Sequence, residues 1–365
     1  MPEVQVLVFV VGTRAQLIKV APVILECESR ACEVKLLMTG QHKETMDDLV
    51  AEFGIRASPD FAMSSTERDS IWGLMAWLPG AFLGVRKFLR RWNKRGSNVF
   101  VLVRGDTLST LVGAAAARSV GARVVHLESG LTSGKVLDPF PEEICRRLVF
   151  RMTDMAMCPS ESAMQHMARY RKVECIDTQG NTILDAVRCA LKALPIPAKA
   201  SYAVVSLHRF QNLYDIGRLT ALVETVVSVA EVMEVHFVLH PATRKRLSQL
   251  SLMQCLDQAP NVILHPRMGY VAFLSLAAAS DCVLTDGGSN QEELAALGVP
   301  TIIMRPRTER ADGLGANAIM EADVHEGVAA FVRDGKHRAL RRNCMPLRAD
   351  GPSRRIVDSV LAHAS

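Results

Sequence analysis

The sequence lacks the features that mark secreted and membrane-inserted proteins. Its nine cysteines are scattered singly and odd in number, with no C-x-x-C pair. Several, such as Cys158 and Cys282, lie in apolar runs, a pattern typical of buried reduced thiols rather than a disulfide framework. The apolar N-terminal run is too short to cross a bilayer, and Glu3 stands where a signal peptide needs positive charge. We therefore expect a cytoplasmic protein.

A large excess of one charge is also absent. The formal net charge is +5 over 365 residues, whereas nucleic-acid-binding proteins usually concentrate far more positive charge on one face. This mild balance suits an anionic small-molecule substrate and predicts no nucleic-acid partner. No group of residues with metal-ligand spacing is visible, so the sequence predicts neither a metal ion nor another cofactor.

What the sequence does have is a regular alternation of apolar runs and amphipathic stretches. The chain is too long for one ordinary core, and its 49% hydrophobic residues are ample for buried sheets. Strand-length runs separated by helical lengths predict doubly wound parallel sheets. Residues 194–200 contain two prolines and form the best linker. We expect an α/β protein of two Rossmann-like domains facing a cleft, residues 1–195 and 196–365, with the last helix a candidate to pack back on the first domain. The expected strands are 4–11, 34–38, 99–103, 123–127, 155–158 and 173–177, then 202–207, 235–239, 262–264, 282–284 and 300–304.

Two glycine-containing turns follow predicted strands and lead into predicted helices. Residues 285–293 read TDGGSNQEE after an apolar run, and Gly12-Thr13-Arg14 follows the first strand. Such a turn presents free N–H groups and the positive end of a helix dipole, which suits a diphosphate. An acid one turn into the later helix, Glu293, is placed to reach ribose hydroxyls.

Four ionisable residues lie where strands end or helices begin. Asp106 and Glu128 follow the runs ending at Val103 and Leu127, Glu142 opens an acidic helix start, and His208 follows the first strand of the second series. Taken alone, each is better explained as a helix cap or a surface ion pair. Four at equivalent topological positions favour an acid–base set in a dry pocket.

Nine ordered segments of the sequence resemble the UDP-N-acetylglucosamine 2-epimerase family, which has a glycosyltransferase-B-like fold. They are spread over most of the chain, in the family's order and at roughly its spacing. These segments are Gly12-Thr13-Arg14 with Lys19, residues 39–42, 105–107, 126–131, 141–147, 180–182, His208-Arg209, residues 285–293 and 308–310.

The resemblance implies a defined reaction. Family members remove the C2 proton of UDP-N-acetylglucosamine and eliminate UDP, giving 2-acetamidoglucal. UDP then adds back, with the C2 configuration inverted, to give UDP-N-acetylmannosamine, or water adds and free N-acetylmannosamine leaves. A related UDP-2-acetamido sugar is the remaining alternative within the family. The resemblance also implies a cytoplasmic homodimer that serves surface-polysaccharide synthesis.

The resemblance carries site roles over position by position. Matching positions are Asp106, Glu128, Glu142 and His208 for catalysis, and Arg14, Lys19, Phe273, Gly287, Gly288, Ser289, Glu293 and Arg310 for binding the UDP-sugar. Phe273, matched to the residue that stacks on uracil, is at least as well explained as a core residue.

The chain departs from the family pattern at several of these segments. Gln16 stands where the family usually has glutamate, Gln211 replaces a glutamate near the histidine, and Thr132 replaces an arginine. The loss of an anion near His208 lowers the pKa expected for its imidazole. The phosphate turn reads Gly-Gly-Ser rather than Ser-Gly-Gly, and we expect it still to hold phosphate.

All three tryptophans lie in residues 71–92, next to a run of basic residues. A basic amphipathic helix can lie on an anionic membrane. We favour instead a helix packed on its sheet, or a dimer interface, with a solvated basic face.

Two functions from other classes remain open. A retaining glycosyltransferase would share the UDP turn but would not need Asp106, Glu128 and Glu142 grouped with His208. An inactive sugar-nucleotide sensor is compatible with Gln211 and Thr132.

Overall fold

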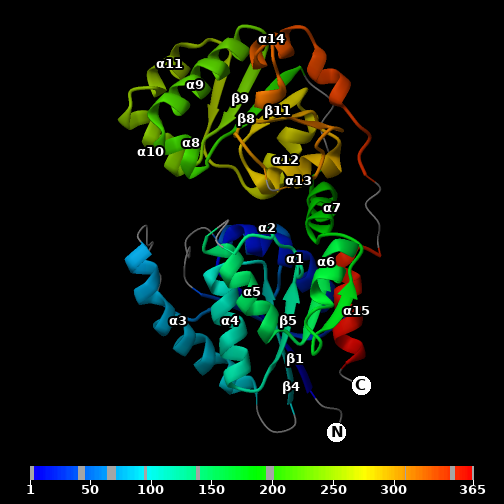
Figure 1. Cartoon of the computed structure of the whole chain (residues 1–365). Coiled ribbons are helices and arrows are strands. Elements are labelled where there is room, and N and C mark those ends of the chain that lie inside the picture. Colours follow the sequence, from blue (N-terminus) through cyan, green and yellow to red (C-terminus); the bar gives the residue numbers. More distant parts are fainter. Residues whose placement is uncertain are drawn as a thin grey trace. The chain divides into compact units, whose positions relative to one another are not determined.

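The computed structural model describes residues 4–39, 46–63, 71–93, 97–136, 140–194, 201–308, 310–345 and 350–363. The chain divides into two compact units (Figure 1). The N-terminal unit consists of Met1–Cys189 and Leu347–Ser365, and the C-terminal unit of Ala190–Pro346. Residues 195–200 of the expected linker lie outside the described part.

The N-terminal unit is built on a parallel seven-stranded sheet in the order β3-β2-β1-β4-β5-β6-β7. The order reverses between β1 and β4, so the loops after these strands diverge and leave a binding position at the switch point. The strands are β1 Val4–Val11, β2 Glu33–Met38, β3 Pro59–Phe61, β4 Ser97–Arg104, β5 Arg123–Leu127, β6 Met155–Cys158 and β7 Glu174–Asp177.

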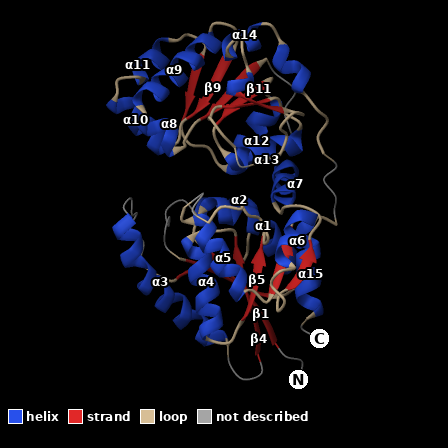
Figure 2. Ribbon diagram, in the orientation of Figure 1, coloured by secondary structure: helices blue, strands red, loops and turns tan. Residues whose placement is uncertain are grey.

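Helices cover both faces of this sheet (Figure 2). They are α1 Arg14–Ser29, α2 Asp47–Phe53, α3 Ile71–Trp92, α4 Leu108–Ser119, α5 Glu142–Met152, α6 Glu161–Met167 and α15 Pro352–Ala362. Helix α7 Ile183–Ala193 begins in this unit and ends in the C-terminal unit. The last helix packs against α1, where Arg30 Nη1 lies 2.5 Å from Asp358 Oδ1. At its start, the Ser353 amide donates to Asp185 Oδ2 at 2.7 Å. The C-terminal segment therefore completes the N-terminal unit.

The tryptophan-rich segment forms α3, which packs on α4 through an apolar face containing Trp77, Val85 and Phe88. Two of its glycines allow close contact with the chain after β3, since a Cβ on Gly84 would lie 2.3 Å from the Ala62 carbonyl oxygen. This packing accounts for the buried aromatic residues. In the part of the chain that the structure describes, no helix is long and apolar enough to span a membrane.

The C-terminal unit repeats the architecture with a parallel six-stranded sheet in the order β10-β9-β8-β11-β12-β13. Its switch point lies between β8 and β11. The strands are β8 Tyr202–Ser206, β9 Glu234–Val238, β10 Val262–His265, β11 Cys282–Thr285, β12 Thr301–Ile303 and β13 Ala318–Met320. The helices are α8 Phe210–Tyr214, α9 Ile216–Ala230, α10 Pro241–Gln249, α11 Met253–Gln258, α12 Tyr270–Ala279, α13 Gly288–Leu297 and α14 Val328–Arg333, with 3-10 helices η2 Glu321–Asp323 and η3 Lys336–Leu340.

Every strand expected from the sequence is present, and the expected fold class of two parallel Rossmann-like sheets is confirmed. Strands β3 and β13 were not expected from the sequence. Each has three residues and lies at the edge of its sheet, so neither carries the buried apolar run that identifies a central strand.

Candidate functional site

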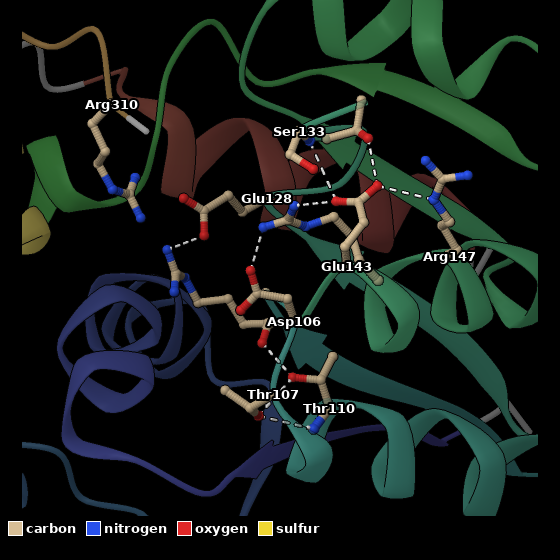
Figure 3. A network of polar contacts seen from close by, with 12 residues as sticks. Asp106, Thr107, Thr110, Glu128, Ser133, Glu143, Arg147 and Arg310 are labelled. Atoms are coloured by element: carbon tan, nitrogen blue, oxygen red, sulfur yellow. Dashed lines mark hydrogen bonds and ion pairs between the residues drawn. The ribbon is translucent and has the colours of Figure 1, made fainter. Parts of the chain in front are cut away.

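Two predicted acids follow neighbouring strands beside the switch point of the N-terminal unit. Strands β4 and β5 are paired with Arg104 opposite Leu127, so Asp106 and Glu128 begin the two adjoining loops. Glu128 has a φ of +59°, a conformation that is uncommon for a residue with a side chain. Backbone strain of this kind is found mainly at functional sites. Figure 3 shows both carboxylates within one network of polar contacts.

Glu128 is surrounded by donors. Its carboxylate pairs with the Arg104 guanidinium, and Asn181 Nδ2 donates to Oε1 at 2.5 Å. The ammonium of Lys19, only 2% exposed, lies 3.7 Å from Oε1. Charged groups this deeply buried are stable only when paired, so these contacts fix the position of both Glu128 and Lys19.

A second acid cluster joins helix α5 to the loop after β4. Arg146 pairs with Asp106, and its Nη1 also lies 2.7 Å from Glu143 Oε2. Glu143 accepts further bonds from Thr132 Oγ1 at 2.5 Å and Arg147 Nε at 3.0 Å. Burial alone would raise the pKa of Glu143, but these hydrogen bonds outweigh it and the pKa is lowered. Glu143 thus anchors the helix that carries the predicted catalytic residue.

That predicted residue, Glu142, is the first residue of α5 and differs from Glu143 in its surroundings. Among the described residues, its Oε2 atom is buried without a hydrogen-bond partner. A buried carboxylate oxygen without a partner is costly unless a ligand completes it. Of the two adjacent glutamates, Glu142 is therefore the one available for chemistry.

Two buried neutral side chains hold the strand ends in place, and neither was predicted. Gln16 Oε1 accepts from the Gly12 amide at 2.8 Å, while its Nε2 donates to the Arg104 carbonyl at 2.7 Å. His126 bridges Gly105 O (2.8 Å) and Ser129 Oγ (3.0 Å). Burial lowers the His126 pKa to about 4, so it acts as a neutral imidazole. The only sequence signal is the capping pattern Thr13-x-x-Gln16, which indicates a helix start rather than this long-range bridge.

The C-terminal unit brings His208 to its own switch point, after β8. The side chain of Asp286, which follows β11, is fully buried and accepts from the His208 amide at 2.9 Å and from Asn212 Nδ2 at 2.9 Å. Asp286 Oδ1 lies 3.5 Å from His208 Nδ1, and the ring stacks on His240 with centroids 4.7 Å apart. Burial lowers the His208 pKa and the Arg209 charge adds to this, while Asp286 opposes them. The structural role of Asp286 was not predicted.

The glycine-rich turn leads into α13, which starts at Gly288 and is buried over its last seven residues. Gly287 caps the helix, and its amide donates to Thr285 Oγ1 at 3.0 Å. A Cβ on Gly287 would lie 2.9 Å from His208 Cε1, so a side chain here would press on the histidine. The turn, the helix N-terminus and His208 therefore form one local arrangement suited to an anion.

Helix α13 also organises the loop containing Arg310. Gln291 Nε2 donates to the carbonyls of Arg310 (3.1 Å) and Asp312 (2.8 Å), and the Arg310 guanidinium pairs with Glu292. Glu293, predicted to bind ribose, lies on the same helix and is 2% exposed. The sequence identified Arg310 but not its carboxylate partner.

The remaining predicted binding residues are Arg14 and Phe273. Arg14 opens α1 and pairs with Asp48 Oδ1 at 2.8 Å. Phe273 lies in the first turn of α12 and is partly exposed. The part of the chain that the structure describes holds no group of three or more His, Cys, Asp or Glu side chains arranged to bind a metal ion.

The fold and site geometry define an α/β enzyme of the glycosyltransferase-B-like class. The model of the UDP-N-acetylglucosamine 2-epimerase family matches residues 25–360, and the chain belongs to that family. A UDP-N-acetylglucosamine 2-epimerase from Methanocaldococcus jannaschii is 30% identical over 85% of this chain and 87% of its own length.

Solved structures agree with this assignment. The structure of the M. jannaschii UDP-GlcNAc 2-epimerase in complex with UDP-GlcNAc and UDP matches with a TM-score of 0.78 and 25% identity, over 98% of this chain and 99% of the other. The Neisseria meningitidis UDP-GlcNAc 2-epimerase bound to UDP-GlcNAc has a TM-score of 0.76 and 24% identity, over 98% of this chain and 99% of its own, and shows the shared fold.

Proposed function

We propose that this enzyme interconverts UDP-N-acetylglucosamine and UDP-N-acetylmannosamine for surface-polysaccharide synthesis. UDP is eliminated to give 2-acetamidoglucal and then adds back to C1, while a proton is delivered to the opposite face of C2. The observation that carries the proposal is that Asp106 and Glu128 follow two adjoining strands. Glu128 lies beside the buried Lys19, and Asp106 is paired with Arg146 of the helix that Glu142 opens. The relatives named above support the choice of sugar nucleotide.

In this proposal the carboxylates of the N-terminal unit act on C2 of the sugar. Removal of the C2 proton needs a base on one face and a proton donor on the other. Glu142 is suited to proton transfer because its Oε2 atom has no hydrogen-bond partner among the described residues. Asp106 is held by Arg146, and Glu128 by Arg104 and Asn181, so both keep defined positions through the reaction.

The C-terminal unit holds the leaving group in this proposal. Gly287, Gly288 and Ser289 offer amides at the N-terminus of α13 to the diphosphate. Glu293 accepts hydrogen bonds from the ribose hydroxyls, and Phe273 stacks on uracil. Arg310 binds the UDP-sugar and is held in position by its ion pair with Glu292. Arg14 and Lys19 add positive charge near the diphosphate and sugar. Because the C2 proton is weakly acidic, stabilising the departing UDP does much of the catalytic work.

The test is solvent exchange followed by NMR. We expect UDP-N-acetylglucosamine incubated in deuterated water to gain deuterium at C2 and to yield UDP-N-acetylmannosamine. Asp106→Asn and Glu142→Gln should each remove most of the exchange while UDP affinity, measured by calorimetry, stays near the wild-type value. Glu161→Gln is the matched control, since Glu161 is an exposed acid in the first turn of α6. Wild-type exchange in both active-site variants would refute the assignment.

The same experiment separates the alternatives. Free N-acetylmannosamine and UDP would identify a hydrolysing epimerase. Transfer of sugar to an added acceptor without C2 exchange would identify a glycosyltransferase, and saturable binding without turnover a sensor. We further propose a homodimer, and light scattering at the mass of a single 40.0 kDa chain would contradict it.

A further inference from the structure

Helix α1 ends in a motif that brings two cysteines together. Ala31 has a φ of +57°, its amide donates to Glu28 O at 3.2 Å, and the Cys32 amide donates to Cys27 O at 3.1 Å. These two bonds define a Schellman motif, in which the third residue from the helix end contacts the residue that directly follows the left-handed one. The contact is usually made by two apolar side chains. Here both are thiols, Cys27 and Cys32.

The two thiols differ in access and in acidity. Cys27 is buried, Cys32 is partly exposed, and their thiols hydrogen-bond to each other. The bond from Cys27 lowers the pKa of Cys32 to about 7, helped by the Arg30 charge, and the same bond with burial raises the pKa of Cys27. An accessible thiolate beside a buried thiol is the arrangement of a peroxide-sensitive cysteine and its resolving partner.

Neighbouring contacts keep this motif in place. Glu28 accepts from the amides of Arg56 (3.0 Å) and Ala57 (2.8 Å), and Arg30 pairs with Glu26 and with Asp358 of α15. The helix end is therefore fixed from two directions. The backbone of the motif, rather than a movement of the chain, brings the two cysteines near each other, as a disulfide requires.

We propose that Cys27 and Cys32 form a reversible oxidation site for hydroperoxides. The Cys32 thiolate attacks the peroxide oxygen, the O–O bond breaks, and the leaving oxygen departs as water or an alcohol after taking a proton. Cys32 becomes a sulfenic acid. The Cys27 sulfur then attacks the Cys32 sulfur, water leaves, and a Cys27–Cys32 disulfide forms. The two thiols lose two electrons in total, and the peroxide gains them.

Trypsin makes the test direct, because it cuts after Arg30 between the two cysteines. After hydrogen peroxide treatment of the whole protein, peptides 20–30 and 31–35 should be detected by liquid chromatography and mass spectrometry as one disulfide-linked species. After dithiothreitol they should be detected separately. Iodoacetamide at pH 7 should label Cys32 at least about threefold faster than the more exposed Cys255 and Cys344, because the lowered pKa of Cys32 leaves much of it as thiolate. Cys32→Ser should abolish the joined peptide, and Cys27→Ala should leave a sulfenic acid that dimedone traps.

Separate peptides in the oxidised wild-type protein would overturn the proposal, as would Cys32 oxidised to sulfinic acid without any joined product. Labelling of Cys32 at or below the rate of Cys255 would also overturn it. All three outcomes are measured on the wild-type chain, so a poorly folded Cys27 variant does not weaken them. Cys344→Ser is the matched control and should leave the joined peptide unchanged.

Discussion

Replacement of Gln16 by leucine tests whether one buried amide sets the geometry of the N-terminal unit. Leucine keeps the volume but leaves the Gly12 amide without its 2.8 Å acceptor and removes the 2.7 Å bond to Arg104 O. Thr110 Oγ1 still donates to that carbonyl at 2.6 Å, so the carbonyl keeps a donor. The main cost is therefore one buried N–H left without an acceptor, together with the lost link between Gly12 and Arg104. An unsatisfied buried donor costs about 1–3 kcal/mol and a lost hydrogen bond about 1 kcal/mol.

We therefore expect Gln16→Leu to lower the free energy of unfolding by about 2–4 kcal/mol in urea titrations. C2 exchange should fall by roughly 10–100-fold, mainly in kcat, because a shift of the loop carrying Asp106 misplaces a reacting group. Gln16→Glu keeps an acceptor for Gly12 and Thr13 and should lose less. An unfolding free energy within about 0.5 kcal/mol of wild type, with unchanged exchange, would show that the bridge has no positioning role.

Three further predictions concern charge and space. Glu143→Gln should lower the free energy of unfolding by about 2–4 kcal/mol, since two arginines lose their carboxylate. The pKa of Glu143 is lowered in the folded state, so urea titrations should show the full loss above pH about 4.3. The loss should shrink as the pH falls through the folded-state pKa of Glu143. Gly287→Ala should weaken UDP binding, measured by calorimetry, about tenfold or about 1.4 kcal/mol, because the added Cβ contacts His208. Gly217→Ala is the control and should bind UDP normally, since its Cβ lies at an ordinary 3.6 Å from Asp215. If the reaction requires neutral His208, kcat/KM should fall only below pH about 6.5. Asp286→Asn removes a charge that raises the His208 pKa, so it should move the acidic limb of the pH profile to lower pH. An acidic limb that does not move would belong to another group.

The sequence predicted the central strands and the residues that follow them, because both depend on local patterns. A buried strand needs an apolar run, and a functional side chain at its end follows within a few residues. Asp106, Glu128 and His208 were predicted in this way. Gln16 and His126 were not, since their partners lie 88 and 21 residues away along the chain, at Arg104 and Gly105. Only the register of the folded sheet brings those atoms within hydrogen-bonding distance.

The structure shows which contacts are made by residues that depart from the family pattern. Thr132, which replaces an arginine, donates its hydroxyl to Glu143 at 2.5 Å, so the position still serves the anchor of α5. Gln16 uses both ends of its amide, one as acceptor and one as donor, and a carboxylate can fill only the first role.

Gln211 matters less to the histidine than its place in the sequence indicates. The sequence predicts a lower His208 pKa from the loss of the nearby glutamate, but Gln211 is exposed at the start of α8. The carboxylate that faces the His208 ring is Asp286, which the chain retains, and burial is the largest cause of the lowered pKa. Asp286 also binds the His208 and Arg209 amides, so its position is fixed by the backbone. Substitution at Gln211 should therefore leave the histidine's titration nearly unchanged, whereas substitution at Asp286 alters its charge and its location together.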